Sequence, residues 1–190
     1  MAEIVNTNQF RNGMHIELDG GVWRIVEFQH VKPGKGGAFV RTKLRNVRSG
    51  AVIERTFNAG VKVGLAIVER KAMQYLYPDG DAFVFMDLET YEQVSVPAEV
   101  MGSAGSYLTE GGEAQVAMHD GVPISVDLPA SLVLTVTTTD PGVKGDTRTG
   151  SLKPATLETG VIVQVPLFVE EGERIKVDTR SGDYIERVKA

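Results

Sequence analysis

A lysine set among glycines is the residue of this sequence best placed to act chemically from the tip of a loop. The loop consists of Lys32, Pro33, Gly34, Lys35, Gly36 and Gly37. Proline fixes its φ and glycine tolerates positive φ, so this composition suits a narrow turn. Lys35 would project from it beside residues of almost no bulk, and its ammonium could meet phosphate or ribose in a crevice. An ordinary glycine-rich hairpin with a solvated lysine fits the same pattern.

A basic stretch surrounds this loop. Residues 28–53 contain no acid, and their basic residues are Lys32, Lys35, Arg41, Lys43, Arg45 and Arg48. Arg41, Lys43 and Arg45 occupy alternate positions, so a strand over residues 38–46 would place all three on one face. Such a patch can hold the phosphates of RNA, although a solvated basic hairpin is an equally good explanation.

The sequence offers no recognisable catalytic or metal-binding set. His15, His30 and His119 are scattered without the spacing of metal ligands, and neither Ser103 nor Ser106 lies in a nucleophile elbow. Cysteine is absent, which excludes disulfides and thiolate zinc sites. The lysine loop lacks the Walker spacing and joins strand to strand, so no helix N-terminus faces a phosphate. We therefore expect a non-enzyme without metal or cofactor.

Charge is distributed unevenly over the 190 residues, whose net charge is −5. Residues 1–65 carry ten basic and five acidic residues, residues 66–128 carry two and eleven, and residues 129–190 carry eight and nine. A hydrophobic share of 42% fits a folded protein, and no apolar run is long enough to cross a membrane. The beginning of the sequence lacks the features of a signal peptide, so we expect the cytosol.

The elements that position these residues are expected to be short strands. The first segment predicts strands at 14–18, 22–30, 38–46 and 52–57, separated by turn signals. The second predicts strands at 66–77, 83–86, 91–96, 114–118 and 123–126, with a short helix within 97–107. The third predicts strands at 132–138, 161–165, 174–177 and 184–188, and a polar loop over 139–152. Strands at this spacing indicate an all-β chain of small barrels, with domains at 1–65, 66–128 and 129–190.

These motifs, taken in order, resemble those of bacterial translation elongation factor P. The resemblance rests on the Lys-Pro-Gly-Lys-Gly loop, on Gly145-Asp146-Thr147 with the Lys-Pro-Ala-Thr-Leu stretch at 153–157, and on Ile-Lys-Val-Asp-Thr-Arg-Ser-Gly-Asp-Tyr at 175–184. It covers essentially the whole chain. It implies an N-terminal SH3-like (KOW-like) barrel followed by two OB-fold barrels. The related hypusine-containing factor lacks the third of these domains.

The resemblance also implies a function. Such a factor binds the ribosome between the peptidyl-tRNA and exit sites and stimulates peptide-bond formation at stalled proline runs. It would act by positioning the peptidyl-tRNA, while the ribosome performs the chemistry. The implied partners are the ribosome, the peptidyl-tRNA, the exit-site mRNA codon and a separate enzyme that modifies the loop lysine. We expect a cytoplasmic monomer without contact to membranes.

Residue roles follow from the same resemblance. Lys35 would contact the CCA end of the peptidyl-tRNA, and it would carry a β-lysyl group, an aminopentanol-type group or no modification. The loop Gly145, Asp146 and Thr147 would lie near the mRNA and the small subunit. Tyr184 and Arg187 correspond to C-terminal positions where we expect contact with the ribosome or tRNA.

A different class of protein, a single-stranded RNA-binding or RNA-chaperone protein built of OB-folds, is the alternative hypothesis. It predicts salt-sensitive binding to isolated RNA through aromatic stacking. An aromatic content of 7% and the acidic middle segment argue against it.

Overall fold

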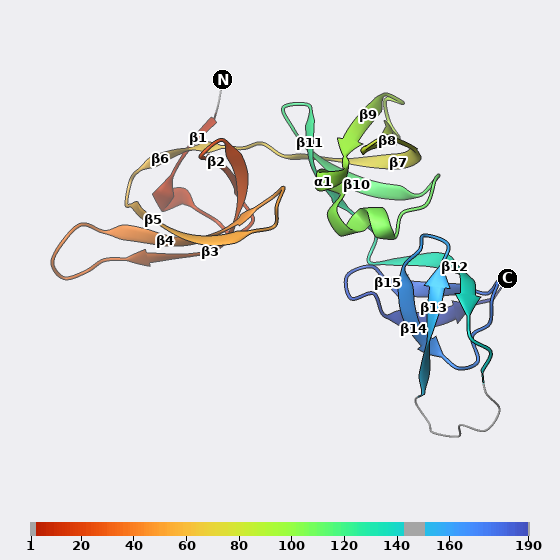
Figure 1. Cartoon of the computed structure of the whole chain (residues 1–190). Helices are drawn as coiled ribbons and strands as arrows, with labels where there is room; N and C mark the ends of the chain where they lie inside the picture. Colours follow the sequence, from red (N-terminus) through yellow and green to blue (C-terminus); the bar gives the residue numbers. More distant parts are fainter. Residues whose placement is uncertain (1–2, 143–150, 190) are drawn as a thin grey trace. The chain divides into compact units, whose positions relative to one another are not determined.

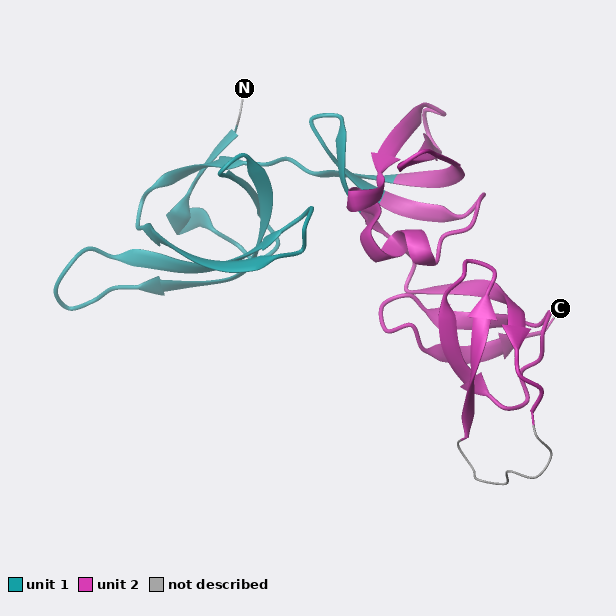
Figure 2. Cartoon of the chain, viewed as in Figure 1, with its two compact units in different colours: residues 1–71, 116–125 teal, residues 72–115, 126–190 magenta. Residues whose placement is uncertain are grey.

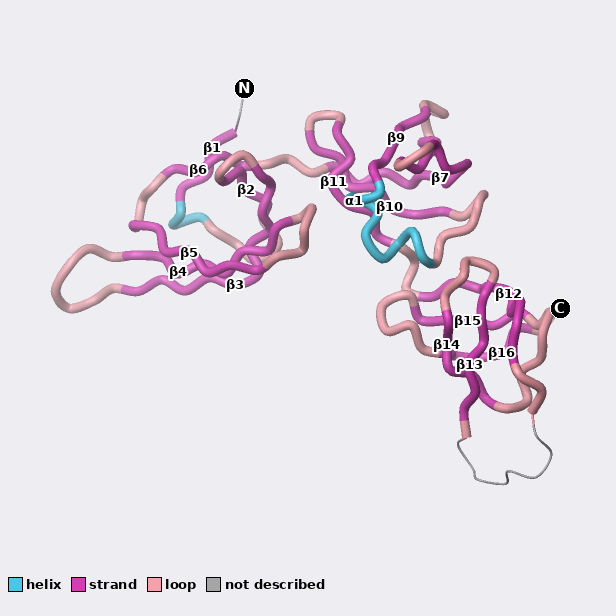
Figure 3. The backbone as a smooth tube through the Cα atoms, viewed as in Figure 1, coloured by secondary structure: helices cyan, strands magenta, loops and turns pink. Residues whose placement is uncertain are grey.

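Three β-sheets contain most of the regular structure in the computed structural model, which describes residues 3–142 and 151–189 (Figure 1). Their strands run from Glu3 to Leu65, from Glu69 to Asp127 and from Ser131 to Val188. The chain is all-β in the described residues, as the sequence predicts. Helix in the described residues is limited to α1 and two 3-10 turns (Figure 3), and none is long and apolar enough to cross a membrane.

The first sheet carries the lysine loop. Its strands, in spatial order, are β1 (Glu3–Asn6), β6 (Lys62–Leu65), β2 (His15–Leu18), β3 (Gly21–Val31), β4 (Phe39–Asn46) and β5 (Val52–Asn58). A 3-10 turn, η1 (Thr7–Gln9), is capped by the Asn6 side chain. The sheet encloses a core of Val5, Phe10, Ile16, Ile25, Val40, Leu44 and Phe57. Inward-facing residues of β2, β3 and β4 thus anchor the hairpin that ends in the loop.

The second sheet has the order β11 (Val122–Asp127), β10 (Glu113–His119), β7 (Glu69–Asp79), β8 (Ala82–Asp87) and β9 (Gln93–Pro97). The helix expected within 97–107 is present as α1 (Ala98–Met101), which continues as the 3-10 turn η2 (Gly102–Ser106). Pro97 occupies the N-cap position of α1. Proline has no backbone N–H, and its absence is tolerated there because the first N–H groups of a helix have no partner within the helix. Gly102, with φ of +53°, ends the α-helix after one turn.

The third sheet has the order β14 (Ile162–Pro166), β13 (Leu152–Leu157), β12 (Ser131–Thr139), β15 (Arg174–Asp178) and β16 (Tyr184–Val188). Its core consists of Leu134, Val136, Ala155, Leu157, Val163, Val165, Val169, Ile175 and Val177. Tyr107, from the segment after η2, packs against the same core.

The chain forms two compact units: residues 1–71 with 116–125, and residues 72–115 with 126–190 (Figure 2).

Three strands were not expected from the sequence. Strands β1 and β6 are four residues long and pair with each other, so neither shows an extended alternation by itself. Strand β13 contains Pro154, which normally argues against an interior strand. The Pro154 carbonyl accepts a hydrogen bond from the Thr139 hydroxyl at 2.9 Å, at the end of β12. Because the nitrogen and carbonyl of one residue in an antiparallel strand point to the same side, the proline nitrogen also faces β12 there. The ladder loses little there, which explains why the proline is tolerated.

Candidate nucleic-acid interface

The lysine loop joins the ends of β3 and β4, the two longest strands of the first sheet (Figure 1). All six of its residues are exposed: Lys32, Pro33, Gly34, Lys35, Gly36 and Gly37. Gly36 has φ of +110°, which a residue with a side chain rarely adopts. A Cβ atom added at Gly34 or Gly37 would have no neighbour within 4 Å. The loop is thus a narrow, solvated tip from which Lys35 projects.

The basic side chains of β4 form a band on the outer face of the hairpin. Arg41, Lys43 and Arg45 are exposed, and the residues that alternate with them, Val40, Thr42 and Leu44, are fully buried. This is the alternation expected from the sequence. Within the described residues, none of these three basic side chains forms an ion pair.

The register of the neighbouring strands distinguishes these three residues. Arg41 lies between Gln29 and Thr56, so neutral residues flank it on both sides. Lys43 lies between Glu27 and Glu54, and carboxylates on both sides reduce its attraction for an anion. Arg41 is therefore the better phosphate contact near the loop.

Arg24 belongs to this band and was missed by sequence reasoning. It lies on β3 directly opposite Arg45, and both side chains are exposed. Like charges at opposite positions destabilise an antiparallel pair, and a bound anion would relieve that repulsion. The β3–β4 register shifts between Ile25 and Glu27, so counting along the sequence could not have shown the pairing.

The C-terminal residues make contacts within their own sheet. Tyr184 is half-buried and packs against the core of the third sheet. Arg187 donates to the Glu173 carboxylate at 2.9 Å, and its guanidinium lies 5.3 Å from the centre of the Phe168 ring. Both residues therefore contribute to their domain, whatever else they bind. Gly145, Asp146 and Thr147 lie outside the described residues.

The three histidines differ in burial and in their neighbours. His30, on β3, meets Phe28 edge-on and is exposed. His15, on β2, is half-buried, and its pKa is lowered by burial and then by nearby Arg24, Arg70 and His119. His15 and His30 are on neighbouring strands, as the sequence allowed, but they pair with different residues.

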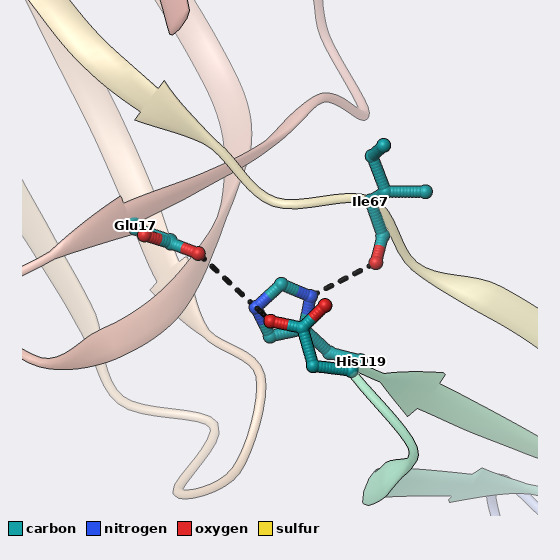
Figure 4. Close-up of polar contacts among 4 residues, drawn as sticks. Glu17, Ile67 and His119 are labelled. Carbon is teal, nitrogen blue, oxygen red and sulfur yellow. Dashed lines mark hydrogen bonds and ion pairs between the residues drawn. The ribbon is translucent and has the colours of Figure 1, made fainter. Parts of the chain in front are cut away.

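His119 has polar partners on both sides of its ring (Figure 4). Nδ1 lies 2.9 Å from the Ile67 carbonyl, which can only accept, so this nitrogen carries the hydrogen. Nε2 lies 3.2 Å from Glu17 Oε1 and 3.6 Å from Asp120 Oδ2. The hydrogen bond to Ile67 is the largest cause of a raised pKa for His119; burial opposes it, and Asp120 and Glu17 add to it. No sequence spacing indicates this cluster, because Glu17 and His119 are 102 residues apart.

Comparison with known proteins decides the family. The chain matches the elongation factor P KOW-like domain over residues 6–63, the elongation factor P OB domain over 68–126 and the elongation factor P C-terminal domain over 132–187. The chain belongs to the elongation factor P family. It is accordingly a translation elongation factor of a ribosome-associated kind.

Relatives along the full length support this assignment. An elongation factor P of Acidothermus cellulolyticus is 57% identical over 187 residues, which are 98% of this chain and 100% of the relative. Those of Salinispora tropica and Acaryochloris marina are each 59% identical over 184 residues, which are 97% of this chain and 100% of each relative. Relatives of this kind carry the names of translation factors, which are not typically enzymes.

A solved structure is similar over part of the chain. It is the translation initiation factor 5A from Methanococcus jannaschii, with a TM-score of 0.54 and 30% identity. The match covers 66% of this chain and 94% of that protein. A factor of the same family from Naegleria fowleri, at 18% identity and a TM-score of 0.52, supports the fold alone.

Proposed function

We propose that this chain binds the ribosome between the peptidyl-tRNA and exit sites and stimulates peptide-bond formation at stalled proline runs. The observation that carries the proposal is the exposed glycine-flanked tip at Lys35, held at the end of the β3–β4 hairpin with a basic band behind it. Family membership supports the ribosome as the partner. In this proposal the chain acts in the cytoplasm as a monomer.

Lys35 contacts the CCA end of the peptidyl-tRNA in this proposal, and a separate enzyme modifies it. The tip contains no acid–base pair, so its contribution is to hold the tRNA. Holding a reactant in its attack geometry removes part of the entropic barrier, and the ribosome supplies the chemistry. Arg24, Arg41 and Arg45 fix the hairpin against the phosphates behind the tip, and Lys43 contributes less. We keep 1–65, 66–128 and 129–190 as the proposed domain limits.

The third domain has the remaining proposed contacts. The loop containing Gly145, Asp146 and Thr147 lies near the exit-site codon and the small subunit in this proposal. Tyr184 and Arg187 support contact with ribosome or tRNA mainly by stabilising the C-terminal sheet, given their packing and the Glu173 ion pair.

Removal of the protein from its host tests the function. A translation reporter with a run of consecutive prolines should stall in the deleted strain, and a reporter without prolines should not. Restoring the intact chain should restore synthesis. Normal synthesis of the proline run without the protein would overturn the proposal. Tight, salt-sensitive binding of the purified chain to short single-stranded RNA without ribosomes would instead favour the RNA-chaperone alternative.

A further inference from the structure

Three side chains that could bind a metal ion meet at the tip of the β10–β11 hairpin, away from the lysine loop. Glu17 comes from β2, His119 ends β10, and Asp120 occupies the turn with φ of +49°. One donor atom from each lies within 4.8 Å of the others. All three residues belong to the same compact unit, residues 1–71 with 116–125 (Figure 2).

The ring of His119 is oriented as a metal ligand would be. Its Nδ1–H donates to the Ile67 carbonyl, a partner outside the cluster. Metal-ligating histidines almost always donate their other N–H to a carbonyl or carboxylate, which fixes the tautomer and the ring orientation. The side chain of His119 is only 16% exposed, so the ring is held in place by its surroundings. Nε2 faces the two carboxylates, so its lone pair is offered to an ion once the proton that it shares with Glu17 is released.

The distances from His119 Nε2 to the two carboxylates suit a tetrahedral ion. Zinc binds histidine nitrogen and carboxylate oxygen at about 2.0–2.2 Å, which places neighbouring ligands of a tetrahedron about 3.3–3.5 Å apart. Nε2 of His119 lies 3.2 Å from Glu17 Oε1 and 3.6 Å from Asp120 Oδ2. We propose that Glu17, His119 and Asp120 form a zinc site, with water in the fourth position. Two carboxylates balance the charge of the ion, and the bound imidazole is neutral.

The donor set favours zinc over magnesium. Imidazole suits zinc, copper and nickel, whereas magnesium prefers six oxygen ligands and gives up its water reluctantly. The site joins β2 to the β10–β11 turn, so a bound ion stabilises the folded unit by mass action. This inference does not depend on the proposed ribosomal function.

Zinc titration of the full-length, chelator-treated chain tests the site, at about pH 8, because the ion binds only the deprotonated imidazole nitrogen. Calorimetry should show one zinc ion per chain, and zinc but not magnesium should raise the thermal midpoint. His119→Gln should weaken zinc binding at least tenfold. The matched control is His30→Gln, because His30 is exposed elsewhere in the same unit and should leave zinc binding unchanged.

Glu17→Gln and Asp120→Asn keep the test decisive if His119→Gln fails to fold, because both side chains are largely exposed, at 44% and 88%. Each should weaken zinc binding while circular dichroism stays unchanged. The proposal is overturned if zinc binds the wild-type chain no more tightly than these variants, or if His30→Gln loses it equally. Equal binding of magnesium would also overturn it, because the cluster would then hold cations without preferring zinc.

Discussion

At the scale of single residues, the basic positions on the outer face of the β3–β4 hairpin differ in how strongly they attract an anion. Arg41 has neutral neighbours on both adjoining strands, and Lys43 has a glutamate on each. The attraction of a phosphate depends on the sum of the charges near it. A count of basic residues therefore overestimates the positive potential of the band. Lys35 is a separate case, since its loop position matters more than its charge.

Arg41→Gln should weaken ribosome binding more than Lys43→Gln. Removing a phosphate contact also makes the plot of log affinity against log salt less steep by about 1, and we expect a larger change for Arg41→Gln than for Lys43→Gln. Binding to purified ribosomes at several salt concentrations measures both quantities. An equal loss for the two variants would show that Glu27 and Glu54 do not moderate Lys43.

Asp178 is expected to make the stability of the fold depend on pH in acid. Its Oδ1 accepts from the backbone N–H groups of Arg180 at 2.8 Å and Ser181 at 3.0 Å, which organises the β15–β16 turn. The hydrogen bond from Ser181, followed by that from Arg180, lowers its pKa below the ordinary 3.8. A lowered folded pKa gives stability that is present above the ordinary value and lost as pH falls through the folded one.

Asp178→Asn should therefore flatten the pH dependence of unfolding below about pH 4, since an amide does not titrate there. Urea unfolding at a series of acidic pH values measures this. Asp183→Asn is the control, because Asp183 lies in the same turn and its carboxylate accepts neither of the hydrogen bonds from Arg180 and Ser181. An unchanged acid slope in Asp178→Asn would contradict the assignment.

At the scale of elements, the strands of the first sheet are specified by alternation with one polar exception. Thr42 is fully buried on the inner face of β4, and its hydroxyl has no hydrogen-bond partner among the described residues. A buried hydroxyl without a partner costs free energy that a methyl group of similar shape does not.

Thr42→Val should accordingly raise the free energy of unfolding by about 1 kcal/mol. Chemical denaturation measures it, with Thr56→Val as control because Thr56 lies on the exposed face of β5. A loss of stability in Thr42→Val would mean that the hydroxyl is bonded, for instance to a buried water.

Gly182 is required in the β15–β16 turn for two reasons. Its φ is +78°, and a Cβ atom there would lie 2.9 Å from the Tyr107 hydroxyl. Gly182→Ala should cost about 1–2 kcal/mol for the backbone and about 1 kcal/mol more for the collision. Gly172→Ala should show the backbone cost alone, because its φ is +83° and no atom lies near.

Thermal or urea unfolding of both variants measures the difference. Removing the hydroxyl with Tyr107→Phe should bring Gly182→Ala close to Gly172→Ala. If the two glycine variants are equally destabilised with Tyr107 intact, the Tyr107 contact contributes nothing.

Elements whose residues follow a clear local pattern could be predicted from the sequence. Alternation over residues 38–46 predicts β4 and its basic face, because each residue's direction follows from the period of the strand. Strand β13 could not be read, because Pro154 is acceptable only at the point where β12 ends. The Arg24–Arg45 and Glu17–His119 pairs depend on a register shift and on long-range packing, which local spacing does not encode.

At the scale of the whole molecule, the net charge of −5 does not reveal the local surface that could bind an anion. The first 65 residues have an excess of five positive charges, and these include the exposed band and Lys35. An overall acidic chain can therefore present a local basic surface to an anionic partner such as RNA.

The most direct test of the central claim is the rate of peptide-bond formation at a proline run on purified ribosomes. The chain should be taken from its native host, so that any group on Lys35 is retained. Lys62→Ala, an exposed lysine of the same sheet, serves as the matched control. The wild-type chain and Lys62→Ala should accelerate the reaction. Lys35→Ala should fold normally and give no acceleration, whereas acceleration equal to wild type would contradict the role of the lysine tip.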